Sequence, residues 1–215
     1  MSLWRGWGIA RGWLTIGLAL SVSGVAYTPI SRGDGASVAH VTAVPDDDKP
    51  RVFAAAMAAV STDARPGELT ATADIQAIGE QAFRVSADTV SYLVPIKYAS
   101  LKASNKICVL LVLNESLQTT AIVRLGGDDF DGDGIVPSCD NVLGVAFHVR
   151  AQVGELDGVF LVSNRIGQQY RRRLVVVSEN AITGTAAFNA ALTHAVTTVS
   201  EPQSVLPALK ILKAH

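Results

Sequence analysis

Apolar residues follow two different patterns on the two sides of residue 90. Before it, the alanine-rich segment 51–60 follows Pro50, and both features favour a helix that begins near this proline. After it, short runs rich in β-branched residues alternate with glycine and asparagine turn signals, a pattern typical of strands. Residues 70–87 fit a helix or a strand equally well. The predicted strands are Val90–Tyr98, Lys106–Leu113, Thr119–Leu125, Val142–Ala151, Val159–Ser163 and Arg173–Ser178.

The connections between these runs are short, which favours antiparallel neighbours because parallel strands need a long crossover. Residues 185–199 contain a second alanine-rich segment and are predicted to form a closing helix. Pro202 and Pro207 are expected to end regular structure. The predicted fold class is α+β: an antiparallel sheet of about five to six strands with an N-terminal and a C-terminal helix, preceded by an export leader. The globular domain is predicted over residues 50–201, with a tail over residues 202–215.

The leader is predicted from the first 31 residues. Arg5 and Arg11 precede an uncharged stretch, residues 12–31, which has an apolar centre and contains the small-residue sequence Gly24-Val25-Ala26. This arrangement is typical of a signal peptide over residues 1–26, cut after Ala26. The stretch is also long enough to be retained as a membrane anchor to about residue 31, and a buried helix is a third alternative. In the first two cases the arginines stay in the cytoplasm and the rest of the chain is exported.

Residues 27–49 are predicted to be a linker, because they mix proline and glycine with the acidic run Asp46-Asp47-Asp48. The composition after it suits a compact folded domain, with 49% apolar and 17% charged residues over the whole chain. The formal charge is only −1, from 18 basic and 19 acidic residues. Such a balance gives no indication of a nucleic-acid partner, and the only predicted membrane contact is through residues 12–31, if they are not cleaved.

The richest local motif is the aspartate run between residues 129 and 141. Aspartates stand at loop positions 1, 3, 5 and 12, a glycine stands at position 6, and position 7 can offer a backbone carbonyl. This spacing lets one turn of backbone place several oxygen ligands around a single Ca²⁺ ion. The predicted metal ligands are Asp129, Asp131, Asp133, Ile135 and Asp140. The alternative is an acidic, glycine-rich surface turn without a metal.

The segment Asp129–Asn141 resembles a single type 3 thrombospondin calcium repeat, of the form D-x-D-G-D-G-I-x-x-x-C-D-N. The resemblance covers 13 of the 215 residues, occurs once where the family has tandem copies, and departs from many of its members at Pro137. It implies calcium as the cofactor. Extracellular calcium is abundant enough to fill a site with a dissociation constant of roughly 10⁻⁴–10⁻³ M.

The chain has two cysteines, Cys108 and Cys139. An oxidising compartment permits a disulfide between them, which would tie a predicted strand to the far end of the aspartate run. The alternative is a buried thiol at Cys108 and an exposed one at Cys139. Neither cysteine has the spacing of a redox or zinc motif.

Catalytic signals are few. The sequence has no nucleophile elbow, zinc-protease motif or phosphate-binding glycine loop. His148 lies within a predicted strand and is expected to face solvent, and His194 lies in the predicted closing helix. The run Arg171-Arg172-Arg173 either binds an anionic partner, such as a cell-wall polymer, or protects a sheet edge from mispairing.

The function expected from these features is an exported, calcium-stabilised structural or interaction domain at the cell surface or envelope, with an unidentified protein or envelope partner. One alternative is a secreted hydrolase with scattered catalytic residues and a calcium-braced loop, in which His148 or His194 is the base. Another is a membrane-anchored subunit of a surface filament or secretion apparatus. Its layout is similar to that of minor pilins, without their glutamate near the start of the apolar segment. Enzymatic activity is the less favoured expectation.

Overall fold

The strands divide between two antiparallel sheets. The computed structural model describes residues 39–63, 74–99, 105–127, 137–150, 155–180, 185–197 and 202–214, all within the compact unit Asp34–His215. The first sheet has the strand order β1-β3-β4-β5-β6, with β2 paired to β4, and the second has the order β10-β9-β8-β7. The bounds of the first sheet are β1 (His40–Ala43), β2 (Gln76–Ala77), β3 (Phe83–Ser86), β4 (Val90–Ala99), β5 (Lys106–Asn114) and β6 (Thr119–Gly126). Those of the second are β7 (Ser138–Arg150), β8 (Glu155–Ile166), β9 (Gln169–Asn180) and β10 (Thr185–Phe188).

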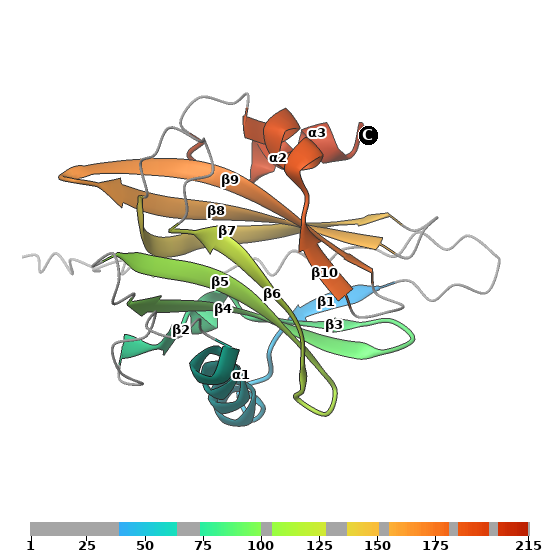
Figure 1. The fold of residues 1–215 in the computed structure, drawn as a ribbon. Coiled ribbons are helices and arrows are strands. Elements are labelled where there is room, and N and C mark those ends of the chain that lie inside the picture. The colour runs from blue at the N-terminus through green and yellow to red at the C-terminus, as the bar shows by residue number, and fades with distance from the viewer. Residues whose placement is uncertain are drawn as a thin grey trace, which may run out of the picture. The chain divides into compact units, whose positions relative to one another are not determined.

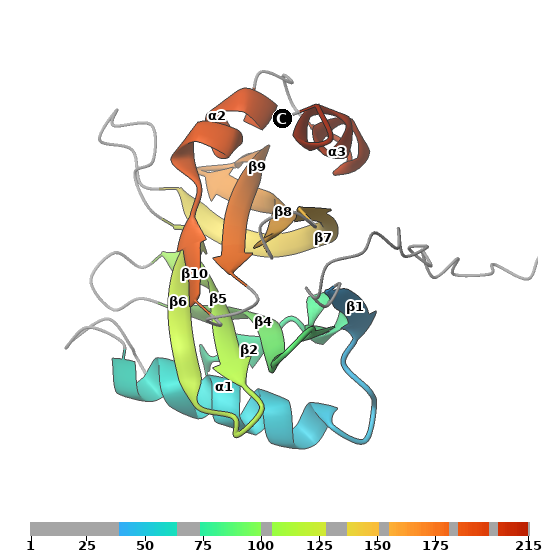
Figure 2. The same ribbon diagram turned by 90° about the vertical axis from the view of Figure 1, so that its right-hand side faces the viewer.

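Helices cover the outer faces of both sheets. Helix α1 (Lys49–Asp63) lies against the first sheet, and α2 (Ala190–Thr197) and α3 (Leu206–Leu212) lie against the second, as Figures 1 and 2 show. A 3-10 turn, η2 (Gly79–Gln81), precedes β3. The result is four layers: helix, sheet, sheet, helices. In the described part of the chain, no helix has the length and apolarity needed to cross a membrane.

Three apolar clusters hold these layers together. The central cluster joins the facing sides of the two sheets through residues such as Leu110 and Phe160. The second packs Val52 and Ala56 of α1 against the outer side of the first sheet. The third packs α2 and α3 against the outer side of the second sheet. Because both faces of each sheet are covered, β5 and β8 are buried along almost their entire length and need apolar side chains on both faces.

The broad prediction of antiparallel sheet with helices before and after it is confirmed, but the prediction of a single sheet is wrong. The chain changes sheets between β6 and β7. The predicted linker, residues 27–49, contains β1, which pairs with β3, so ordered structure begins before Pro50. The predicted short strand Val159–Ser163 is part of the longer β8, because Gly158 lies inside the strand and leaves space for the Phe160 ring.

The C-terminal predictions also need correction. The predicted closing helix over residues 185–199 is a strand, β10, followed by the shorter helix α2. The predicted tail contains α3, in which Pro207 stands in the first turn, where its missing amide hydrogen costs nothing. Ala208, Leu209 and Leu212 of this helix are buried, so residues 202–214 belong to the folded domain. The predicted leader, residues 1–26, and the possible anchor to residue 31 lie outside the described residues.

Candidate functional site

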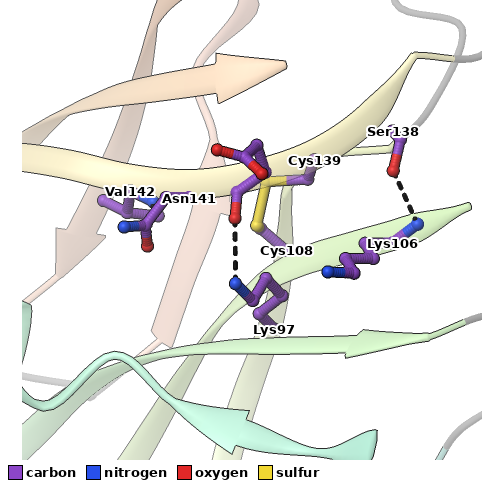
Figure 3. The surroundings of a disulfide bond; sticks show 8 residues. Lys97, Lys106, Cys108, Ser138, Cys139, Asn141 and Val142 are labelled. Atoms are coloured by element: carbon purple, nitrogen blue, oxygen red, sulfur yellow. Dashed lines mark hydrogen bonds between the residues drawn. A yellow bond between two sulfur atoms is a disulfide. The ribbon is translucent and has the colours of Figure 1, made fainter. Parts of the chain in front are cut away.

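The two cysteines form a disulfide between the sheets. Cys108 of β5 and Cys139 of β7 are bonded, with their Cα atoms 5.7 Å apart, and both are fully buried. The predicted bond is thus confirmed, and Figure 3 shows it spanning the gap between two strands. A buried disulfide is typical of proteins that fold in an oxidising compartment outside the cytoplasm.

The disulfide anchors the C-terminal part of the aspartate run, because Cys139 is one of its residues. Gly127 has a φ of +88°, and a Cβ atom there would lie 2.7 Å from the carbonyl oxygen of Lys106, so this position requires glycine. Within the run, just after the described chain resumes at residue 137, Oγ of Ser138 accepts a hydrogen bond of 2.9 Å from the backbone amide of Lys106 (Figure 3). The described residues on the two sides of segment 128–136, Gly127 and Ser138, therefore both lie beside the backbone of Lys106.

Of the predicted metal ligands, only Asp140 lies in the described part of the chain. It is a partly buried residue of β7, and the pairing with β8 passes from Cys139 to Asn141, so Asp140 is the extra residue of a β-bulge. Its backbone carbonyl accepts a hydrogen bond of 3.0 Å from Nζ of Lys97. Asp129, Asp131, Asp133 and Ile135 lie outside the described residues, so the calcium site remains a prediction.

The donor set fits calcium better than a softer metal, because carboxylate and carbonyl oxygens are hard ligands. Near the disulfide, Oδ1 of Asn164 is buried and has no hydrogen-bond partner among the described residues; it would lie 2.8 Å from a Cβ at Gly126. The Lys97 ammonium acts in the opposite direction, since it places a positive charge close to Asp140. No group of three potential ligands is found among the described residues.

A second polar cluster, which the sequence did not indicate, surrounds Asp157 on the outer face of the second sheet. Its side chain is 1% exposed, yet it is well partnered. Arg150 places Nη2 3.1 Å from Oδ1 and Nε 2.8 Å from Oδ2, and the Ser178 hydroxyl also donates to Oδ1. Ser178 accepts a bond from Asn189, whose own Oδ1 caps the first turn of α2. The cluster therefore fixes α2 on the sheet, a structural role.

His148 lies opposite Asp157 in the pairing of β7 and β8. It is half-buried rather than fully exposed, and burial lowers its pKa, a change that Asp157 opposes and Lys213 and Arg150 reinforce. Among the described residues, no hydrogen bond joins a carboxylate or hydroxyl group to the side chain of His148 or of the exposed His194. The hydrolase alternative, which needs such a base, receives no support from this arrangement.

Glu179 is a second buried acid that the sequence pattern did not indicate. It is 2% exposed and lies on the face of β9 that meets the first sheet, where Ser91 of β4 donates a hydrogen bond of 2.6 Å to its Oε1. Its Oε2 has no partner among the described residues and the side chain borders a small apolar cavity between the sheets. Burial raises the pKa of Glu179, and the Ser91 bond only partly opposes this. A sequence signal existed: the two-residue repeat puts residue 179 on the same face as Val175 and Val177.

Comparison with known proteins does not add a family: no family model, curated protein or solved structure gave a significant match to this chain.

Proposed function

We propose that this protein is an exported structural or interaction domain of the cell surface or envelope, stabilised by its disulfide and by one Ca²⁺ ion bound in the loop Asp129–Asn141. Neither the metal nor the role requires a catalytic centre. The domain would present surfaces on a rigid, two-sheet frame.

The proposal is supported by one observation: Gly127 and Ser138, on the two sides of segment 128–136, lie close together. A loop that wraps an ion must start and finish close together, and here Gly127 and Ser138 both contact the backbone of Lys106. The neighbouring disulfide keeps these two ends together even though they belong to different sheets. The entropy cost of bringing the ends of the loop together is incurred when the domain folds. Ion binding then has a smaller entropy cost, so its affinity is higher.

Export is supported by two independent features. The N-terminal sequence has the pattern of a leader, and the disulfide is of the kind that persists outside the cytoplasm. Calcium outside the cell is plentiful, so a weak site with one short aspartate at position 12 is sufficient.

The test is thermal unfolding of the purified protein in millimolar calcium and in EDTA. An ion that binds only the native state raises stability, here by about 1 kcal/mol for a site with a dissociation constant of roughly 10⁻⁴ M. For a domain of this size the melting temperature should rise by about 2–4 °C. The variant Asp131→Asn should lose the difference, and magnesium should not reproduce it because Mg²⁺ demands a tighter octahedral site.

The matched control is Asp47→Asn, which removes an exposed acid from the segment before α1. It should keep the full response to calcium. Identical melting curves in calcium and EDTA would remove the metal from the proposal, and an equal loss in both variants would show that the effect is only one of net charge.

A further inference from the structure

The β8–β9 hairpin ends in a cluster of exposed cationic and aromatic side chains. Ile166 pairs with Gln169, so the turn has two residues, and Gly167 takes a φ of +60°, as tight hairpin turns require. Arg165, Tyr170, Arg171 and Arg172 follow on the two strands, and all four are exposed. These four residues are called the basic tip. Figure 1 shows this closed end of the hairpin at the left of the view.

The register places three members of the basic tip on one face. Arg165 lies directly opposite Tyr170 on β8, and Arg172 lies two residues beyond Tyr170 on β9, so both arginines share a face with Tyr170. The side chain of Arg172 is held by a hydrogen bond to Gln203. Arg171 points to the opposite face, where it pairs in register with Asn164.

The positive charge of the tip is not balanced along the hairpin. Between Gly158 and Ser178 there is no aspartate or glutamate, and no ion pair of Arg165 or Arg171 is present among the described residues. Three of the acids in the strands of this sheet lie at its other end: Glu155 and Asp157 bind Arg150, and Glu179 accepts a bond from Ser91. The fourth, Asp140 of β7, lies nearer the tip, where the Lys97 ammonium is bonded to its backbone carbonyl. Sheet-edge protection alone would explain the arginines, but it would not explain a tyrosine that is 60% exposed on the same face as two of them.

We propose that the basic tip binds an acidic oligosaccharide, with the arginines engaging its carboxylate or sulfate groups and Tyr170 packing against a sugar ring. Guanidinium groups form paired hydrogen bonds with carboxylates, and an exposed phenol ring offers an apolar face with a polar edge. The choice of an envelope glycan rests on the proposed function, because such polymers lie outside the cytoplasm.

A nucleic acid fits less well. Removing the three arginines of the basic tip, Arg165, Arg171 and Arg172, from the 18 basic residues leaves 15 against 19 acidic ones, so the rest of the chain is acidic. Nucleic-acid binding proteins follow a long phosphate backbone with an extended basic surface, which one hairpin end does not provide.

The test is titration of the purified protein with a short oligogalacturonate, in EDTA and at low salt, with neutral oligogalactan and single-stranded DNA as the other probes. The double variant Arg165→Gln/Arg171→Gln should weaken oligogalacturonate binding by about tenfold, since it removes two charged hydrogen-bonding groups. Tyr170→Ala should weaken binding while leaving its salt dependence unchanged, because it removes packing and no charge.

The control is the double variant Lys49→Gln/Arg51→Gln on α1, which changes net charge equally and leaves the hairpin intact. It should bind like the parent. No binding by the parent, equal weakening in the control, full binding by Tyr170→Ala, or tighter binding of DNA than of oligogalacturonate would each overturn the proposal. Because the assay contains EDTA, its outcome is independent of the calcium site, whose own test is the melting curve.

Discussion

The two ends of the central core are joined by different chemistry. At one end, Cys108 of β5 is bonded covalently to Cys139 of β7, and Lys97 reaches the backbone of the same strand. At the other end, Ser91 of β4 and Glu179 of β9 share one hydrogen bond beside a cavity. Lys97 and Ser91 lie near opposite ends of β4, so the apolar core lies between these two connections.

The two ends of the core are therefore expected to respond to different conditions. The disulfide end is insensitive to pH and depends on the redox state. The Glu179 end depends on protonation, because the ionised carboxylate is buried and no cation contributes to its pKa. The first end is therefore expected to hold the sheets together under all pH conditions in which the second weakens.

Removing the disulfide should have the largest effect. The variant Cys108→Ala/Cys139→Ala frees a loop with a sequence separation of 31 residues. Chain entropy predicts a loss of about 3–4 kcal/mol in the free energy of unfolding, measured by urea denaturation. A reducing agent should destabilise the parent by a similar amount and leave the variant unchanged. A loss below about 1 kcal/mol would mean that the disulfide does not dominate its end of the core.

Removing the hydrogen bond at the other end should cost less. Ser91→Ala leaves both oxygens of Glu179 without a partner among the described residues. The expected loss is about 2 kcal/mol in the free energy of unfolding, the cost of an unsatisfied buried polar group. Ser91→Thr, which retains a hydroxyl, serves as the comparison. Equal stability of Ser91→Ala and the parent would show that the bond contributes nothing to joining the sheets.

Removing the ionisable group should have the smallest effect and the opposite sign. The raised pKa means that the folded protein holds the Glu179 proton to higher pH than the unfolded chain. The stabilisation is therefore complete below the ordinary value of 4.5 and is lost as the pH rises through the raised one. Glu179→Gln keeps an acceptor for Ser91 and cannot ionise, so it should be more stable by about 1 kcal/mol at neutral pH.

The measurement is urea unfolding of Glu179→Gln and the parent across this pH range. Their difference should shrink as the solution becomes acidic, where the parent is protonated in both states. Glu115→Gln, at an exposed position in the turn between β5 and β6, should show no such trend. A constant difference at all pH values would assign the effect to packing and would contradict the role of ionisation.

The strand positions could be predicted from the sequence, but their division between sheets could not. Residues 107–113 are apolar at every position, and this is the signal of a strand covered on both faces. A linear pattern does not say whether the second cover is a helix or another sheet. Asn189 is a favourable N-cap and could have indicated that a helix begins at Ala190. The alanines before Asn189 have high helix propensity, however, so the pattern predicted an earlier start.

The disulfide was predictable because a chain with an expected export leader and two cysteines allows one pairing. Glu179 and Asp157 were not found, because their importance comes from burial by strands distant in the sequence. Each is polar at the end of an apolar run, which is also where a strand ordinarily emerges into solvent. The aspartate run was recognised from the spacing of its residues alone. The melting experiment in calcium and EDTA tests whether it binds a metal ion.

The two interruptions in β7 have a consequence for association. This long strand is an edge strand of the second sheet, and its pairing with β8 skips both Asp140 and Leu143. A neighbouring copy that tried to continue the sheet there would meet a backbone whose hydrogen-bonding groups are out of step at two points. These bulges are expected to disfavour edge-to-edge pairing of molecules into fibres, to which an apolar edge strand is otherwise prone.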